Sequence, residues 1–293
     1  MQENLYRMLK LFQRNLKKKI FVSLIAAMML VSACSSSNTG TGSAGNDKLA
    51  KVKAAGKLVV GTSPDYPPAE FYIIDESGNK KIVGYEMSLA QAIADEIGVT
   101  LEIKATDFHG VQANIQSNQV DIGIAGFSRT EERAKVMDFS IGYNQESKHG
   151  WQGIMIRKED AEKYATLDDF KNAKLTLGAQ AGSIQYEMAQ KLTDVSKIKQ
   201  MGTLDALVMA LNAKDIDAVI ISTDNATSML STFPELMILP QEGFNLDPDS
   251  FYGVNVALLT KASGDENKAF LEVVNKAIEK AKSDGSFEKW RAE

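Results

Sequence analysis

The sequence is poor in the residues from which metal and disulfide-stabilised sites are built. Its 293 residues include one cysteine and two histidines, so no intrachain disulfide can form and no zinc site of usual spacing exists. The motifs G-x-S-x-G, H-E-x-x-H and G-x-x-x-x-G-K-S/T are also absent, so the sequence indicates no hydrolase elbow, metalloprotease helix or phosphate loop. Carboxylates alone would have to supply any metal site. We therefore expect no cofactor, and a large hydrophobic core must hold the fold.

Long apolar runs are scarce, and the one that stands out is near the N-terminus. Residues 20–31 are apolar except for Ser23, and three lysines at 17–19 precede them. This run is shorter than the roughly 20 residues that a membrane-spanning helix needs. A basic region, a short apolar core and small residues are typical of a secretory signal. We therefore expect residues 1–33 to be a signal peptide.

The single cysteine follows directly after this segment. Val31-Ser32-Ala33-Cys34 resembles a bacterial lipobox, in which the cysteine is lipidated, as with palmitate, and becomes the new first residue. An ordinary signal followed by a chance cysteine is the alternative. Residues 34–50 are expected to be a flexible tether, because residues 35–46 are small and polar and cannot bury enough apolar surface to fold. The N-terminus thus predicts an extracytoplasmic lipoprotein anchored to the cell membrane at Cys34.

The charge of the chain argues against nucleic acid as a partner. The whole sequence has a net charge of −5, and residues 1–33 contain six basic residues and one acid. The remaining chain is therefore more acidic than the whole, which disfavours binding to a polyanion. Its length suits two domains or one large one.

Strand-like and helix-like segments alternate from residue 57 onward. The helical spacing of Leu89, Ile93 and Ile97, followed by Gly98, is one example of the pattern. This order predicts an α/β fold with mainly parallel sheets covered by helices. Strands are expected at 58–60, 101–103, 121–125, 153–156, 174–177 and 217–221, and helices at 84–97, from 166, from near 183, from near 203 and at 266–282.

Two segments of the chain repeat a similar pattern, which we call the internal echo. NIQSNQVDIGIAG (114–126) and ALNAKDIDAVIIS (210–222) share a helix end, a polar turn, an aspartate and a buried strand. Two similar lobes would explain both the echo and the length of the chain. The alternative is that any helix-to-strand connection looks this way.

Polar and aromatic side chains follow the ends of several expected strands, where open α/β sheets bind ligands. The helix start at Ser183 offers free backbone N–H groups, and Arg133 can clamp a carboxylate with two bonds. Aromatic rings add a flat apolar wall. Such a set suits a small molecule with a carboxylate, such as an amino acid. For Arg133 alone, the alternative is a solvated turn at the start of a short helix.

The segment GYEMSLAQAIADEIG (84–98) resembles the signature of family 3 of the bacterial extracellular solute-binding proteins, which deliver polar amino acids to ABC importers. It departs from that signature at Ser88, where the family usually has an acid. The segments GTSPDYPPAEF, which precedes it, and AGFSRTEERAKVMDFS, GAQAGSIQ and DAVIIS, which come after it, fall in the order expected for the family. The resemblance covers residue 57 to the C-terminus.

The resemblance implies a type II periplasmic-binding-protein-like fold, in which two α/β lobes are joined by a two-strand hinge. The crossings would fall near 143–150 and 240–248. Lobe 1 would comprise residues 51–146 and return at 245–293, and lobe 2 would comprise residues 147–244.

The resemblance also implies the roles of the site residues. Arg133 would bind the ligand carboxylate with help from Ser128 and from backbone N–H groups near Ser183. Tyr66 and Phe108 would sandwich the ligand side chain, and the Gly126 carbonyl would accept from its amino group. The implied ligand-binding set is Tyr66, Phe108, Ala125, Gly126, Ser128, Arg133, Gly182, Ser183, Ile184, Ser222 and Asp224.

Ser222 is a departure from the family at the implied site. The family usually places an acid there to pair with the ligand ammonium, and a buried ammonium without a counter-charge is costly. Asp224 and Glu70 are the candidate replacements, and either could instead be a solvated loop acid.

The resemblance implies a monomeric binding protein, not an enzyme, that captures an amino acid or related small carboxylate for an ABC transporter permease. One alternative is an enzyme on the same scaffold that resembles cyclic-acid dehydratases, with His109 as the acid/base residue. The other alternative is a ligand-sensing lipoprotein that serves no transporter.

Overall fold

The computed structural model describes residues 47–145 and 148–293. The expected signal peptide, Cys34 and most of the expected tether lie outside the described residues. The first described helix, α2 (Lys48–Ala55), begins after Asp47, whose side chain accepts a hydrogen bond from Leu49 N. Residues 48–50, expected in the tether, are therefore helical. Within the described ranges, no helix has the length and apolar character needed to cross a bilayer.

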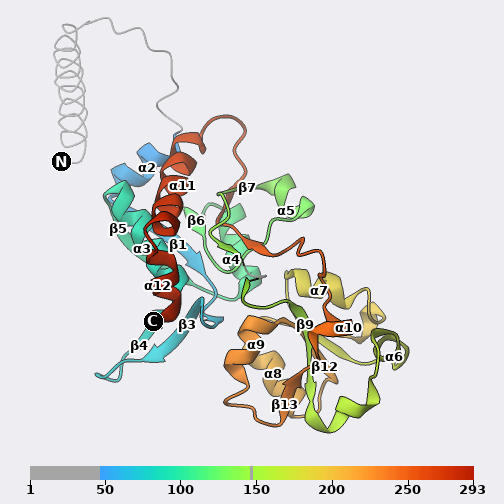
Figure 1. The fold of residues 1–293 in the computed structure, drawn as a ribbon. Helices are drawn as coiled ribbons and strands as arrows, with labels where there is room; N and C mark the ends of the chain where they lie inside the picture. The colour runs from blue at the N-terminus through green and yellow to red at the C-terminus, as the bar shows by residue number, and fades with distance from the viewer. Residues whose placement is uncertain (1–46, 146–147) are drawn as a thin grey trace, which may run out of the picture. The chain divides into compact units, whose positions relative to one another are not determined.

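The first five-stranded sheet has the strand order β5-β1-β6-β15-β7. β1 (Lys57–Thr62) is parallel to β5 (Thr100–Ala105) and β6 (Ile122–Gly123). β15 (Leu258–Thr260) is antiparallel to both β6 and β7 (Met137–Phe139). A strand from near the C-terminus therefore lies inside a sheet that is otherwise built from the first half of the chain (Figure 1).

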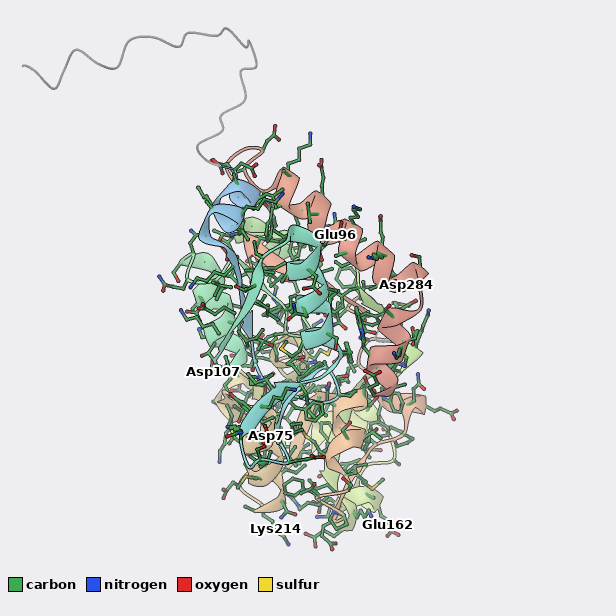
Figure 2. All side chains as sticks on the ribbon, turned by 90° about the vertical axis from the view of Figure 1, so that its left-hand side faces the viewer. Asp75, Glu96, Asp107, Glu162, Lys214 and Asp284 are labelled. Carbon is green, nitrogen blue, oxygen red and sulfur yellow. The ribbon has the colours of Figure 1, made fainter. Side chains whose placement is uncertain are left out.

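Helices with one apolar face pack on this sheet. α3 (Tyr85–Ile97) buries Leu89 and Ile93 and ends at Gly98, whose φ of 82° is left-handed, as the sequence predicts. α11 (Lys268–Ser283) packs beside α3, and Figure 2 shows both on one face. The other helices of this part are α4 (Phe108–Gln116), α5 (Glu131–Val136) and α12 (Ser286–Ala292).

The second five-stranded sheet, of order β11-β10-β12-β9-β13, repeats the pairing pattern of the first. Its central strands β10 (Leu177–Gln180) and β12 (Ala218–Ser222) are parallel, as are β10 and β11 (Ile198–Met201). β9 (Gln152–Arg157) is antiparallel to both β12 and β13 (Leu236–Ile238). The expectation of mainly parallel sheets is thus wrong for half the pairings, because β15 and β9 run against their neighbours.

Most of the helix starts expected in the second sheet's layer are present. The Thr166 capping box begins α6, and Ser183 and Thr203 cap α7 and α8. β10 begins at Leu177, later than the expected residue 174, because Lys174 has a left-handed φ of 51° after α6. The helices of this layer are α6 (Leu167–Asn172), α7 (Ile184–Ala189), α8 (Leu204–Asn212), α9 (Thr223–Met229), α10 (Gln241–Phe244), and the short η2 (Lys158–Lys163) and η3 (Val195–Lys197).

The internal echo in the sequence corresponds to two equivalent connections. α4 leads to β6 through Asn118, and α8 leads to β12 through Lys214, with left-handed φ values of 55° and 68°. Asp121 then accepts a hydrogen bond from Val59 N at 2.9 Å, and Asp217 accepts one from Thr176 N at 2.8 Å. Each aspartate thus fastens its strand to the neighbouring central strand.

Two short antiparallel strands connect the two parts of the fold. β8 (Asn144–Gln145) pairs with β14 (Val254–Asn255). β8 lies where the first crossing was expected. The second crossing, β14, lies beyond the expected 240–248, because Leu246 and Tyr252 still pack against the core of the second sheet. A separate three-stranded sheet, β2 (Asp65–Tyr66), β3 (Glu70–Ile74) and β4 (Lys80–Val83), includes the hairpin β3–β4 (Figure 1).

Candidate functional site

A small cavity lies between side chains of the first and second sheets. Three of its lining residues, Gln180, Ile184 and Gln185, come from β10 and α7. Gln180 and Gln185 were missed in the sequence, although both flank the quoted glycine-rich turn. The lining residues from the first sheet's loops are all expected ones: Tyr66, Phe108, Ala125, Gly126, Ser128 and Arg133.

Arg133 is held at this cavity by both sheets. The Thr130 side chain caps α5 by accepting from Arg133 N, which directs the arginine inward, and its exposed fraction is 7%. Its Nη1 donates to Ser128 O at 2.6 Å and its Nη2 to Gly182 O at 3.0 Å. The guanidinium also lies 5.6 Å from the Phe108 ring centre. The solvated-turn alternative is therefore wrong for Arg133.

The charge of Arg133 is only weakly compensated. Burial lowers its pKa to about 10, so it is cationic at neutral pH. Its two hydrogen-bond acceptors are neutral carbonyls. Glu187 acts on it electrostatically but does not line the cavity. A buried guanidinium in such surroundings favours a carboxylate, which can accept two parallel charge-assisted bonds.

Gly126 brings the backbone close to the ring of Tyr66. Its φ is 59°, and a Cβ there would lie 2.7 Å from the Tyr66 ring, so only glycine fits. Its N–H donates to Glu86 at 3.0 Å, and its carbonyl accepts from Asn255 Nδ2 at 3.0 Å. The carbonyl keeps a second lone pair. Its expected contact with a ligand amino group stays a prediction.

Gly182 and Ser183, both expected at the site, are not among the residues that line the cavity. The Ser183 side chain caps α7 by accepting from Tyr186 N at 3.2 Å. Ile184 and Gln185, in the first turn of α7, do line the cavity.

Ser222 and Asp224 do not line the cavity. Ser222 is fully buried at the end of β12, and its Oγ has no hydrogen-bond partner. Asp224 forms an ion pair with Arg291 of α12, whose guanidinium lies 5.0 Å from the Tyr85 ring centre. Glu70, the other candidate acid, is fully buried, and desolvation raises its pKa well above the usual range.

Asp65 is a bridging residue that the sequence did not single out. Its Oδ2 accepts from Leu204 N at 2.6 Å and from Gln180 Nε2 at 2.9 Å, both in the second sheet's layer. Its Oδ1 accepts from Ser63 Oγ at 2.7 Å. Leu204 begins α8, whose first N–H groups have no partner within the helix and favour a carboxylate. Asp65 therefore joins the loop that carries Tyr66 to the second sheet.

Asp65 should make stability depend on pH. Desolvation raises its pKa from 3.8 to about 6, so the folded state holds the proton more tightly than the unfolded chain. Its contribution to stability is then greatest below the unfolded pKa and declines as the pH rises through 6. The stability of wild type relative to Asp65→Asn should fall by about 2–3 kcal/mol between pH 4 and 7. Urea unfolding at each pH measures this difference.

Asp75→Asn is the matched control for that prediction. Asp75 is partly exposed in the β3–β4 turn (Figure 2), and backbone hydrogen bonds from Asn79 and Ser77 lower its pKa. It stays ionised in both states above pH 4, so the same comparison should change little. An equal slope for both aspartates would contradict the assigned role of Asp65.

The described residues offer no obvious catalytic or metal centre. In residues 47–145 and 148–293, no group of three or more His, Cys, Asp or Glu side chains could hold a metal ion. His109 is exposed, and its Nδ1 lies 3.1 Å from where a Cβ on Gly182 would sit. The arrangement is suited to holding a small anion.

Known proteins resemble this chain along nearly its whole folded length. A family model described as bacterial extracellular solute-binding proteins, family 3, matches residues 58–293. The chain is 29% identical over 276 residues to the arginine-binding extracellular protein ArtP of Bacillus subtilis, covering 93% of this chain and 96% of that protein. It is 27% identical over 246 residues to the L-cystine-binding protein TcyJ of Escherichia coli K12, covering 83% of this chain and 85% of that protein.

The solved structures that match include ligand-bound transport proteins. One is an amino acid ABC transporter substrate-binding protein from Streptococcus pneumoniae bound to L-arginine, with a TM-score of 0.71 and 31% identity. The match covers 84% of this chain and 96% of that chain.

Proposed function

The chain belongs to family 3 of the bacterial extracellular solute-binding proteins, and on that premise we propose that it captures an amino acid or related small carboxylate and delivers it to an ABC importer. Its fold is of the type II periplasmic-binding-protein-like class, with two α/β lobes. Membership of this family also confirms the expectation of a binding protein rather than an enzyme.

The observation that carries the proposal is Arg133. A guanidinium with an exposed fraction of 7% reaches the cavity from the first lobe and bonds to Gly182 of the second. A ligand carboxylate at this position would contact both lobes and so favour the closed arrangement over the open one. The relatives named for arginine and cystine support an amino-acid-sized ligand.

We assign the rest of the expected site by the same reasoning. Tyr66 and Phe108 would enclose the ligand, and Ser128 and the first turn of α7 would assist Arg133. In this proposal lobe 1 begins with residues 51–146 and lobe 2 begins at residue 147. The return to lobe 1 is placed at β14 (Val254–Asn255) instead of the expected residue 245, because Leu246 and Tyr252 pack in the core of the second sheet. Cys34 would carry a lipid that anchors the monomer to the outer face of the cell membrane, where it meets its permease.

Thermal unfolding of the purified protein with each of the twenty amino acids tests the proposal. Ligand at 100 times its Kd adds about 2.7 kcal/mol of stability. At roughly 2–4 °C per kcal/mol, this gives an easily measured increase in Tm. The ligand identified should then fail to accumulate in cells that lack the protein. Binding without any effect on uptake would instead favour a sensory role, and turnover of the ligand would favour an enzyme.

A further inference from the structure

The charges around the cavity constrain the class of ligand, if the cavity is the ligand site proposed above. Among the described residues that line it, Arg133 is the one charged side chain; the others are aromatic, aliphatic, amide, hydroxyl or glycine. One bound carboxylate would neutralise this cation. A zwitterionic amino acid also brings an ammonium, which needs an acid nearby because an unpaired buried charge is costly.

The two acids that bridge to the cavity lining are already engaged. Asp65 accepts three hydrogen bonds, from Ser63, Gln180 and Leu204. Glu86 accepts from Gly126 N at 3.0 Å and from Tyr143 Oη at 2.6 Å. A ligand ammonium would have to displace these contacts in order to pair with either carboxylate.

The remaining candidate acids are also poorly placed. Asp224 is neutralised by Arg291. Glu70 is fully buried beside Glu86. Desolvation, followed by repulsion from Glu86, raises the pKa of Glu70, so its uncharged form is favoured. Glu187 on α7 interacts with Arg133 and does not line the cavity. An experiment therefore has to test whether Glu187 pairs with a ligand ammonium.

The wall of the site on the second lobe is polar but neutral. Ser222 of β12 lies directly opposite Gln152 of β9, so their side chains share one face of the sheet. Gln185, which lines the cavity, donates from Nε2 to Gln152 Oε1 at 2.8 Å. Ser222 itself does not line the cavity, so the amides of Gln180 and Gln185 are the polar side chains that the second sheet's layer presents to it. Hydroxyl and amide groups can bond a neutral polar group and provide no charge for an ammonium.

We propose that this site takes a small carboxylate whose second polar group is uncharged, such as a 2-hydroxy acid or an Nα-acylated amino acid, in preference to a free amino acid. Arg133 binds the carboxylate, and the neutral amides of Gln180 and Gln185, which line the cavity, receive the uncharged hydroxyl or amide. This inference rests on the proposed function, because it refines the ligand of the same site.

Matched ligands test the proposal by calorimetry on the purified protein. Each L-amino acid is compared with its Nα-acetyl derivative and with the corresponding 2-hydroxy acid. For the side chain that binds, wild type should prefer an uncharged analogue by about 10-fold or more. Gln185→Glu places a carboxylate in the cavity lining and should shift the preference toward the free amino acid by about 10- to 100-fold, because a nearby carboxylate compensates an ammonium. Gln185→Met, which is uncharged and of similar length, should not shift the preference toward the free amino acid.

Three outcomes would overturn the inference. The first is wild type binding a free amino acid more tightly than its analogues. The second is loss of amino-acid binding in Glu187→Gln, which would identify Glu187 as the counter-charge. The third is an unchanged preference in a Gln185→Glu protein whose Tm shows it to be folded. Failure of every ligand to bind, or binding that is independent of Arg133, would instead overturn the proposed function.

Discussion

Arg133→Ala should lower ligand affinity by about 100-fold or more. A buried, charge-assisted pair that loses one partner costs about 2–5 kcal/mol, and each 1.4 kcal/mol is a factor of ten in Kd. Arg133 has an exposed fraction of 7% and no competing acid among its hydrogen-bond acceptors, so its charge is available to a carboxylate. Calorimetric titration of wild type and variant with the ligand from the thermal screen measures the ratio.

Arg129→Ala is the matched control for this change. Arg129 lies in the same turn and carries the same charge, but it is exposed, 5.0 Å from the Phe139 ring centre. Its removal should change Kd by less than about threefold, as expected for an exposed charge. Arg133→Lys keeps the charge but loses the two-pronged geometry, so its affinity should fall between those of wild type and Arg133→Ala. Equal affinities for a folded Arg133→Ala protein and wild type would refute the carboxylate clamp.

Gly84→Ala should destabilise the protein by about 3 kcal/mol or more. Its φ is 122°, a conformation that side chains other than glycine rarely adopt, and a Cβ there would lie 2.1 Å from Ala69 O. The close approach lets the loop at 68–69 cap the start of α3. No side chain caps α3, and instead Tyr85 N and Glu86 N donate to the carbonyls of Pro68 and Ala69. The midpoint of urea unfolding measures the loss.

Gly78→Ala is the control that separates the effect of the steric clash on stability from the effect of the backbone conformation. Gly78 has a φ of 81° and no heavy atom within 4 Å of a Cβ position, so only the positive φ should matter, at about 1 kcal/mol. The larger loss expected for Gly84→Ala is then due to the contact with the loop at 68–69. That loop continues from Tyr66, so Gly84→Ala should also weaken ligand binding. Similar losses for both variants would show that the close approach is unimportant.

Local features of the fold were predictable from the sequence. The capping residues Thr166, Ser183 and Thr203 start helices, and Gly98 ends one, because these signals act within one helical turn. The insertion of β15 between β6 and β7 was not predictable from these patterns. It depends on a pairing between distant segments that no local pattern encodes.

The residues of the candidate site were likewise predictable from the sequence only in part. Arg133, Tyr66 and Phe108 follow strand ends and meet at the cavity. Asp65 was missed because its partner Gln180 is 115 residues away in the sequence. The ion pair of Asp224 was missed for a similar reason, because Arg291 returns to it from the C-terminal helix, 67 residues later.

The position of β15 also determines the order in which the two lobes can be completed during synthesis. The strands of the second sheet all lie within residues 152–238, so they are synthesised before β15 and α11. Until then the first sheet has a gap between β6 and β7, and its core lacks Phe270, Val274 and Ile278. A nascent chain that stops near residue 245 would therefore carry every strand of the second sheet beside an unfinished first lobe with exposed apolar surface. The first sheet, although four of its five strands are made before the second sheet, is the last to be completed.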